Sequence, residues 1–153
     1  CRGLSVWNNQ VFWVSGSNGT VAVSYDAGAT INWQKIKGYE DKDFRDIHIF
    51  SPAEIIVMAI GNPAVMLKSV DSGKSWFKVF EKNQEGMFLD AFDFKGKSGY
   101  CIGDPIDNHF VILQTKDKGN SWQTINNTPL ADSGEACFAS SGTNIAALNF
   151  VMR

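Results

Sequence analysis

Short apolar segments separated by glycine, asparagine and aspartate recur along the whole sequence. One set of them ends at or just before a glycine: Val11–Val14 before Gly16, Ile55–Ile60 before Gly61, and Tyr100–Ile102 before Gly103. No stretch has the sustained i, i+3, i+4, i+7 apolar spacing of an amphipathic helix. Runs of this length bounded by turn-forming residues are typical of β-strands. The pattern therefore predicts an all-β fold.

Three further sets of segments stand in the same order around each of these strands. A second strand follows the glycine, at Thr20–Val23, Ala64–Leu67 and Phe110–Leu113. A segment that begins at a tryptophan comes next, at Trp33–Ile36, Trp76–Val79 and Trp122–Ile125. One more strand precedes each unit, at Leu4–Val6, Ile47–Phe50, Ala91–Phe94 and Ala136–Ala139. Four short strands in about 45 residues predict the four-stranded blade of a β-propeller.

A motif of the form [Ser/Thr]-x-Asp-x-Gly-x-[Ser/Thr]-Trp occurs three times between the third and fourth predicted strands. Its copies begin at Ser24, Ser69 and Thr115, which are 45 and 46 residues apart, and the first copy has two extra residues before its tryptophan. One copy could arise by chance, but three at a constant period indicate a repeat protein. This repeat is the main signal in the sequence.

The motif has the residue types of a tight turn. Its aspartate can accept hydrogen bonds from backbone N–H groups further along the turn, and its glycine allows the positive φ that such a turn requires. We expect the tryptophan ring to be buried between adjacent blades, with its indole N–H bonded to a local acceptor. We therefore assign structural roles to Asp26, Gly28, Trp33, Asp71, Gly73, Trp76, Asp117, Gly119 and Trp122.

The three motifs resemble the Asp-box, or BNR, repeats of sialidases and many other propellers. The larger pattern resembles the photosystem II stability/assembly factor-like propellers of Bacteroidetes type, through Phe44–Ile47, Gly103–Ile106 and Ser133–Gly142. The resemblance covers essentially the whole chain. It implies a ring of six or seven blades and a binding or assembly role. Because Asp boxes occur in hydrolases, receptors and assembly factors alike, they indicate the fold better than the function.

The number of repeats predicts about three and a half blades. We assign residues 1–153 to a single partial propeller domain, with blades at about 2–44, 45–88 and 89–133 and the start of a fourth at 134–153. An open arc of blades would expose apolar sheet faces. We therefore expect that further blades lie outside this sequence or, as the alternative, that two chains form a homodimer that completes the ring.

The predicted strand starts lie around the central channel, at the opposite end of each blade from the Asp boxes. Aligning them places Arg2, Arg45, Leu89 and Gly134 in register, followed by Gly3, Asp46, Asp90 and Glu135. The ends of the second strands add Asn18, Asn62, Asp104 and Asp107. We predict a ligand-binding rim made of Arg2, Arg45, Asp46, Asp90, Asp104, Asp107 and Glu135. The alternative is that Arg45 only forms an ordinary ion pair with Asp46 or Asp90.

Composition and charge narrow the classes of partner. The formal net charge is −2 and the pI about 5.6, so the basic surface of a nucleic-acid binder is not expected. No apolar run approaches the roughly 20 residues of a membrane-spanning helix. The sequence has 44% hydrophobic and 20% charged residues, which is typical of a folded globular protein. We expect a protein or glycan partner, no nucleic acid and no transmembrane segment.

The sequence offers little support for an enzyme. A sialidase needs three arginines around a carboxylate, together with a tyrosine nucleophile. Here only Arg2 and Arg45 are suitably placed, and Arg153 stands at the end of the chain. The histidines His48 and His109 form no recognisable metal or triad motif. We predict a non-catalytic binding or assembly module without cofactor or metal, and keep a sialidase-like glycan-processing hydrolase as the alternative.

The three cysteines leave two questions open. A Cys101–Cys137 disulfide is compatible with the sequence, which does not decide it. Cys1 stands either at the start of a fragment or processed chain or at the acylated start of a mature lipoprotein. Asp-box propellers of the resembling kind suggest an exported protein, periplasmic or at the cell surface. No signal peptide is visible in this sequence.

Overall fold

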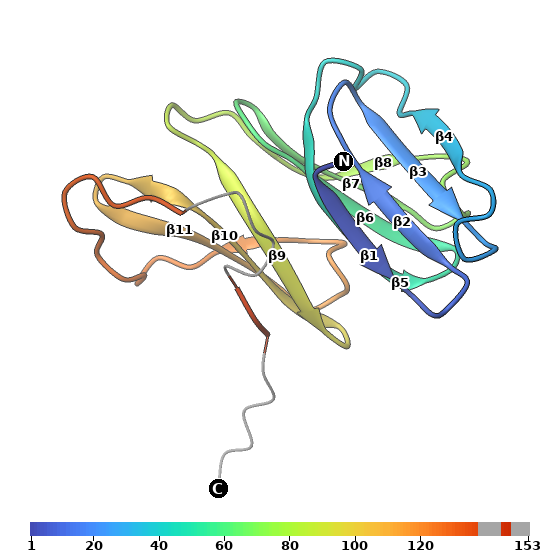
Figure 1. The fold of residues 1–153 in the computed structure, drawn as a ribbon. Helices are drawn as coiled ribbons and strands as arrows, with labels where there is room; N and C mark the ends of the chain where they lie inside the picture. Colours follow the sequence, from blue (N-terminus) through green and yellow to red (C-terminus); the bar gives the residue numbers. More distant parts are fainter. Residues whose placement is uncertain (138–144, 148–153) are drawn as a thin grey trace, which may run out of the picture.

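The computed structural model describes residues 1–137 and 145–147, and within them the chain forms twelve strands and no helix. The strands build three four-stranded antiparallel sheets in sequence order (Figure 1). Blade 1 consists of β1 Gly3–Val6, β2 Phe12–Ser15, β3 Thr20–Ser24 and β4 Asn32–Lys35; blade 2 of β5 Phe44–Ser51, β6 Glu54–Ala59, β7 Ala64–Ser69 and β8 Phe77–Lys82; blade 3 of β9 Leu89–Lys95, β10 Ser98–Ile106, β11 His109–Thr115 and β12 Gln123–Thr124. The predicted all-β partial propeller is confirmed.

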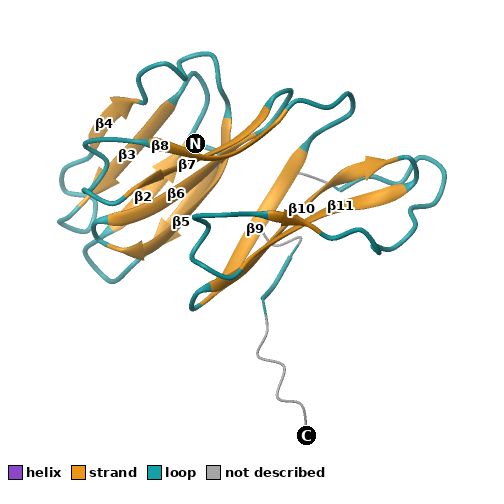
Figure 2. Cartoon of the chain, turned by 180° about the vertical axis from the view of Figure 1, so that it is seen from behind, coloured by secondary structure: helices purple, strands orange, loops and turns teal. Residues whose placement is uncertain are grey.

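The blades are joined through their first strands. Strands β1 and β2 contact β5, and β5 and β6 contact β9, so the first strand of each blade lies closest to the neighbouring blade. Seen from behind, the strands of each sheet run back and forth, with loops at both ends (Figure 2). Among the described residues, no helix could span a membrane.

The core lies between the blades. One cluster joins blade 1 to blade 2 and includes Trp13, Val21, Ile47, Ile55 and Leu67. The Trp13 ring meets the Trp76 ring edge-on, with centroids 6.3 Å apart. A second cluster joins blade 2 to blade 3 and includes Ile56, Met58, Met66, Leu89 and Phe92. Successive side chains of β6 enter different clusters because neighbouring positions on a strand point to opposite faces.

The three Asp boxes form nearly identical turns between the third and fourth strands. In the second box, Gly73 donates its N–H to Ser69 Oγ at 2.9 Å, and Ser75 donates its N–H to Asp71 Oδ1 at 2.9 Å. Hydrogen bonds from the hydroxyl and N–H of Ser75 and from Ser69 lower the pKa of Asp71 to about 2. Gly73 has a φ of 79°, a backbone conformation that favours glycine.

The tryptophans that close the boxes have different surroundings. Trp76 is partly buried and donates its indole N–H to Gly73 O at 3.1 Å. Trp122 packs against the second cluster, but its indole nitrogen has no partner among the described residues. The prediction of burial is wrong for Trp33, which is 63% exposed. The boxes of blades 2 and 3 rest on the preceding blade, and the described chain has no blade before blade 1.

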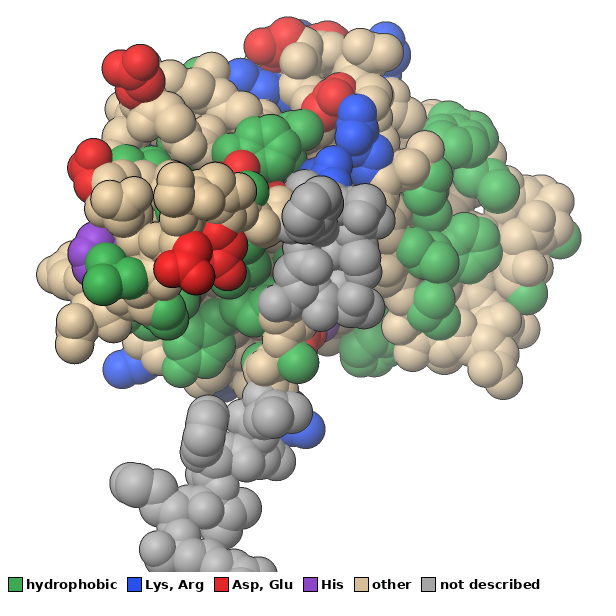
Figure 3. All heavy atoms as spheres, turned by 60° about the vertical axis from the view of Figure 1, so that its left-hand side comes forward, with side chains coloured by type: hydrophobic (Ala, Val, Ile, Leu, Met, Phe, Trp, Pro, Cys, Tyr) green, Lys and Arg blue, Asp and Glu red, His purple; other side chains and the backbone are tan. Residues whose placement is uncertain are grey.

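Blade 1 therefore presents an uncovered apolar face. Leu4 and Val6 are 60% and 63% exposed, and they lie opposite Val14 and Phe12 across the β1–β2 pair. Figure 3 shows hydrophobic side chains gathered over this blade, on the right of the view. Such a patch is the face that a neighbouring blade covers in a propeller.

A buried lysine of blade 2 forms hydrogen bonds with the Asp box of blade 3. Lys68, on β7, is fully buried, and its ammonium group donates to Lys118 O at 2.8 Å and to Asn120 Oδ1 at 2.9 Å. The same nitrogen forms an ion pair with Glu54 Oε1 at 2.9 Å, and Lys118 Nζ binds the other oxygen of Glu54 at 2.9 Å. Burial alone would raise the pKa of Glu54, but the hydrogen bonds from Lys118 and Lys68 lower it. The Phe50 ring lies 5.1 Å from Lys68 Nζ.

The structure differs from the predicted strands at the end of the chain. The last segment of blade 3 was predicted at Trp122–Ile125, but β12 is limited to Gln123–Thr124. The first strand of a fourth blade was predicted at Ala136–Ala139. Ala136 and Cys137 belong to no strand, and residues 138 and 139 lie outside the described residues.

Candidate functional site

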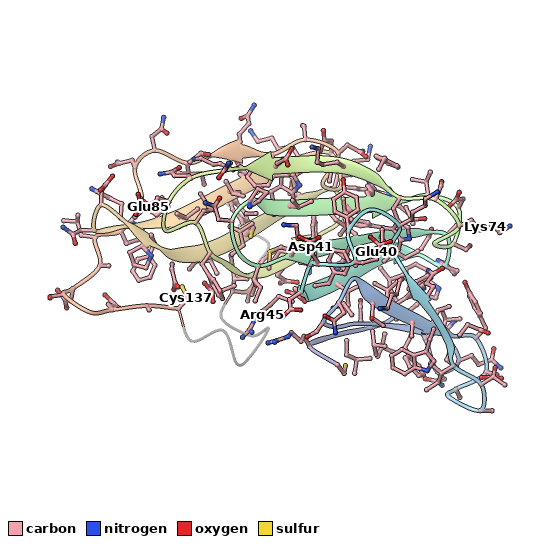
Figure 4. All side chains as sticks on the ribbon, turned by 90° about the horizontal axis from the view of Figure 1, so that it is seen from above. Glu40, Asp41, Arg45, Lys74, Glu85 and Cys137 are labelled. Carbon is pink, nitrogen blue, oxygen red and sulfur yellow. The ribbon has the colours of Figure 1, made fainter. Side chains whose placement is uncertain are left out.

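The starts of β5 and β9 meet at one end of the blades, as the register of the repeats predicts. Figure 4 shows Arg45 and Cys137 close together in the view from above, with Lys74 of the second Asp box far from both. Blade 1 reaches the same place: a Cβ atom added at Gly3 would lie 3.0 Å from Arg45 O and from Asp46 Cα. The first strands of blades 1 and 2 thus approach closely beside Arg45.

The two arginines of the predicted rim have different surroundings. Arg2 is held by local partners, because its Nη2 lies 3.1 Å from Asp43 Oδ2 and its Nε donates to Ser17 Oγ at 3.2 Å. Arg45 forms no ion pair and no hydrogen bond through its side chain with any residue of the described ranges. The ordinary ion pair of Arg45 with Asp46 or Asp90, considered as an alternative, is absent. Among the described residues, Arg45 is therefore the rim arginine whose guanidinium group has no partner.

Asp46 connects the two blades through backbone hydrogen bonds. It accepts the N–H of Ile47 at 2.9 Å and, across the blade boundary, the N–H of Phe92 at 3.0 Å. Burial raises the pKa of Asp46 to about 6, although these hydrogen bonds and the charge of Arg45 oppose the shift. Each carboxylate oxygen thus has a backbone partner, which gives Asp46 a structural task in the joint between β5 and β9.

Asp90 occupies the equivalent position in blade 3 but has no such partners. It is 1% exposed, and neither carboxylate oxygen has a hydrogen-bond partner among the described residues. Burial, together with the charge of Asp104, raises the pKa of Asp90 to about 7, while the charge of Arg45 and the nearby backbone N–H of Asp104 act against this shift. That N–H donates to Phe88 O at 2.9 Å. A buried carboxylate without partners is energetically unfavourable, so its surroundings need an explanation.

Two further side chains face Asp90. One oxygen of Asp90, one of Asp104 and the sulfur of Cys137 all lie within 4.8 Å of one another. Asp104 also accepts the N–H of Cys137 at 2.9 Å. Burial raises the pKa of the Cys137 thiol to about 11, and the nearby charges of Asp90, Asp104 and Glu135 add to this shift. Carboxylates and a thiol in this arrangement are residues that could hold a metal ion.

The remaining predicted rim residues do not join this group. Asp107 lies in the β10–β11 turn with a φ of 52° and lines a separate hollow of about 260 Å³ with His109 and Thr128. Glu135 is exposed and accepts the N–H of Asp132 at 2.8 Å. The structure therefore gathers Arg45, Asp46, Asp90 and Asp104 with Cys137, places Arg2 beside them, and separates Asp107.

Sequence reasoning did not assign Cys137 to the rim. The signal was present, because Cys137 follows Glu135 by two positions, as Phe92 follows Asp90. All three cysteines are free, so the Cys101–Cys137 disulfide is not formed. Cys101 is buried beside Met58, and burial raises the pKa of its thiol well above the usual value.

Both histidines contact other residues of the protein. The His48 ring packs against the rings of Phe50 and Phe94, with centroids 4.7 Å away in both cases, and burial lowers the pKa of His48. His109 Nδ1 lies 3.2 Å from Thr128 O. Both contacts suit structural roles.

Comparison with known proteins identifies relatives of this fold. The family model described as Photosynthesis system II assembly factor YCF48 matches residues 32–146, three quarters of the chain. No curated protein matches the sequence. Among solved structures, "YCF48 bound to D1 peptide" has a TM-score of 0.60 and 23% identity and matches 80% of this chain. YCF48 from Cyanidioschyzon merolae has a TM-score of 0.58 and 19% identity and matches 82%.

A propeller enzyme shares the architecture. The GH74 xyloglucanase from Xanthomonas campestris has a TM-score of 0.55 and 14% identity and matches 75% of this chain and 18% of its own. The present chain spans 39% and 40% of the two YCF48 chains. At these identities the structural matches show the fold, while the family model shows the family.

Proposed function

The chain belongs to the Photosynthesis system II assembly factor YCF48 family, and on that premise we propose that it is a non-catalytic propeller module that binds a protein segment at the rim beside Arg45. The observation that carries the proposal is the partly buried Arg45 side chain, which has no charged or hydrogen-bonding partner in the described ranges although acidic residues surround it. The solved relative bound to a D1 peptide supports a protein segment as the kind of ligand.

The chemistry of the rim suits a peptide that carries a carboxylate. A guanidinium group can donate two parallel hydrogen bonds to one carboxylate, a stronger and more directional contact than a lysine makes. Arg45 is the group available for this contact. Asp104 and Glu135 lie near Cys137, and they can accept N–H groups of an extended peptide or meet its basic side chains. A peptide offers a carboxylate, N–H groups and basic side chains together.

The test is peptide binding measured by fluorescence anisotropy. The probes are the D1 peptide and two sets of short peptides of equal length, which differ only in whether they contain Asp or Glu. We expect the acidic set to bind more tightly. The variant Arg45→Gln should weaken this binding by about tenfold to 100-fold, the range of a charge-assisted hydrogen bond of about 1.5–3 kcal/mol.

Lys74→Gln is the matched control, because it removes one positive charge from an Asp box far from the rim (Figure 4). It should leave peptide affinity unchanged at moderate ionic strength. Equal loss of affinity in both variants would indicate general charge attraction and contradict a site at Arg45. Unchanged affinity in Arg45→Gln would contradict it as well.

A glycan-processing hydrolase is the second candidate. The shared architecture with a GH74 xyloglucanase and the raised pKa of Asp90, which suits a general acid, favour it. Two features oppose it: Asp90 is 1% exposed, so a sugar would not reach it, and Arg2 is already paired with Asp43. The third arginine considered for a sialidase, Arg153, lies outside the described residues. Hydrolysis of fluorogenic sialosides or of xyloglucan, lost in Arg45→Ala, would overturn the non-catalytic assignment.

A further inference from the structure

The group of Asp90, Asp104 and Cys137 can be compared with the equivalent positions at the junction between blades 2 and 3. By the register of the repeats, the junction between blades 2 and 3 has Asp46, Asn62 and Phe92 at the three corresponding positions. Asp46 accepts two backbone N–H groups there, one of them from Phe92. The junction after blade 3 keeps the aspartate and replaces the amide and the phenyl ring by a carboxylate and a thiol, so both changes introduce metal-ligand types.

The backbone does not satisfy Asp90 in the way that it satisfies Asp46. By the same register, the N–H of Cys137 would be the counterpart of the N–H of Phe92, but it donates to Asp104 at 2.9 Å. Asp90 is left 1% exposed, and both of its oxygens lack partners among the described residues. A buried carboxylate requires a hydrogen-bond donor, a proton or a cation, so a cation bound at this position would stabilise Asp90.

From this arrangement we propose that Asp90, Asp104 and Cys137 form a Zn²⁺ site at the rim. Zinc binds cysteine sulfur at about 2.3 Å and carboxylate oxygen at about 2.0–2.2 Å in a tetrahedron, which places its ligand atoms about 3.3–3.7 Å apart. The three ligand atoms already lie within 4.8 Å of one another. A contraction of about 1 Å, within reach of small side-chain rotations, would complete the geometry.

The ligand types favour zinc over other common cations. Calcium and magnesium bind oxygen ligands almost exclusively, whereas a thiolate beside carboxylates suits the borderline-soft Zn²⁺. Three protein ligands leave the fourth position for water or for a group of a bound partner. Asp104 and Cys137 are partly exposed, so that position opens toward the rim.

The surrounding charges are compatible with a bound cation. Two carboxylates and a thiolate with Zn²⁺ have a formal charge of −1, which the nearby Arg45 balances. Asp46 and Glu135 contribute further negative charge around the cysteines of this region. Without a metal, the carboxyl groups of Asp90 and Asp104 lie close to each other and to the Cys137 thiol, and their negative charges repel. A divalent cation bound between them would attract all three groups.

Zinc binding to the untagged chain under reducing conditions tests the proposal. We expect about one Zn²⁺ per chain in equilibrium dialysis, and Co²⁺ in its place should give a thiolate-to-cobalt charge-transfer absorption. Cys137→Ser, Asp104→Asn and Asp90→Asn should each lower the affinity by more than about tenfold, since even the loss of an outer-shell partner costs about 10–100-fold. Asp90→Asn replaces an unpartnered buried carboxylate with a neutral amide of the same shape, so the loss of folding is not expected there.

Cys1→Ser and Asp107→Asn are the matched controls, because they remove the same ligand types outside the group. Both should bind zinc like the unmodified chain and keep the cobalt absorption. The proposal is overturned if the unmodified chain retains no zinc, which would mean that Asp90 is simply protonated. It is also overturned if Cys137→Ser binds zinc as tightly as the unmodified chain, or if Cys1→Ser abolishes binding.

Discussion

Replacing the buried Lys68 by methionine should destabilise the joint between blades 2 and 3. Methionine has a similar length and adapts to irregular spaces, so the substitution removes the charge with little change in packing. The ammonium group donates to Lys118 O and Asn120 Oδ1 and pairs with Glu54. Glu54 keeps its other partner, Lys118, but the carbonyl oxygen of Lys118 and the amide oxygen of Asn120 lose the lysine that binds them.

The magnitude follows from these contacts. Removal of one member of a buried ion pair costs about 3–5 kcal/mol, since the other groups stay buried without compensation. The remaining Glu54–Lys118 pair places the expectation toward the lower end, at about 3 kcal/mol in the free energy of unfolding. With a urea dependence of about 2 kcal/mol per molar, the midpoint of denaturation should fall by about 1.5 M.

The assay is equilibrium urea denaturation followed by tryptophan fluorescence. Lys78→Met is the matched control, because Lys78 also pairs with a glutamate, Glu81, but on the exposed outer strand β8. It should leave the midpoint unchanged within error, as exposed ion pairs contribute little. A midpoint shift in Lys68→Met no larger than that in Lys78→Met would show that the buried lysine contributes no more to stability than an exposed one.

Two other predictions follow from the described contacts. Gly73→Ala adds a Cβ atom 2.5 Å from the Trp13 ring at a φ of 79°, and it should lower the free energy of unfolding by about 2–4 kcal/mol. Gly38→Ala is the control, because Gly38 has a similar φ of 85° but no atom within 4 Å of the added Cβ. It should cost only about 1 kcal/mol in the same thermal or urea assay. For Asp46, the pKa is about 6 in the folded chain against an ordinary 3.8, so the folded state binds more protons between these values and stability falls as pH rises from about 4 to above 6. The free energy of unfolding should fall by about 3 kcal/mol over this range, at 1.36 kcal/mol per pKa unit. The urea midpoint of Asp46→Asn should depend less on pH than that of the unmodified chain. Identical pH profiles would contradict a raised pKa at Asp46.

The repeats made the fold predictable, because each blade carries the same turn chemistry at the same spacing. Asp71, Gly73 and Ser75 specify a local turn, and the alternating apolar strands around it specify a sheet. Lys68 shows what sequence could not supply. A lysine in an apolar strand gives no sign that two of its partners, Lys118 and Asn120, lie on a loop 50 and 52 residues later. Trp33 shows the effect of two extra residues in the first box: it lies within β4 opposite Ala22, whereas Trp76 precedes β8, and no described blade covers its ring.

The candidate site was predicted in part for the same reason. Aligning the strand starts placed Arg45, Asp46 and Asp90 at one end of the blades, because the register is a property of the repeat. Their different surroundings arise from long-range contacts, such as the N–H of Phe92 on Asp46 and that of Cys137 on Asp104. Export and the homodimer stay predictions. Light scattering after size exclusion tests the homodimer, which a folded monomer of 16.9 kDa would contradict.

The contacts of the Asp-box loops of blades 2 and 3 with the preceding blade also make the described chain a linear array of coupled units. Blade 2 is held on both faces, by Trp13 of blade 1 and by the box loop of blade 3, whereas blade 1 is held on one. In such an array the stability of a unit depends on how many neighbours it has, and opening proceeds inward from an uncovered end. Amide hydrogens of β5–β7 should therefore exchange with solvent most slowly, and those of β1 and β4 should exchange first.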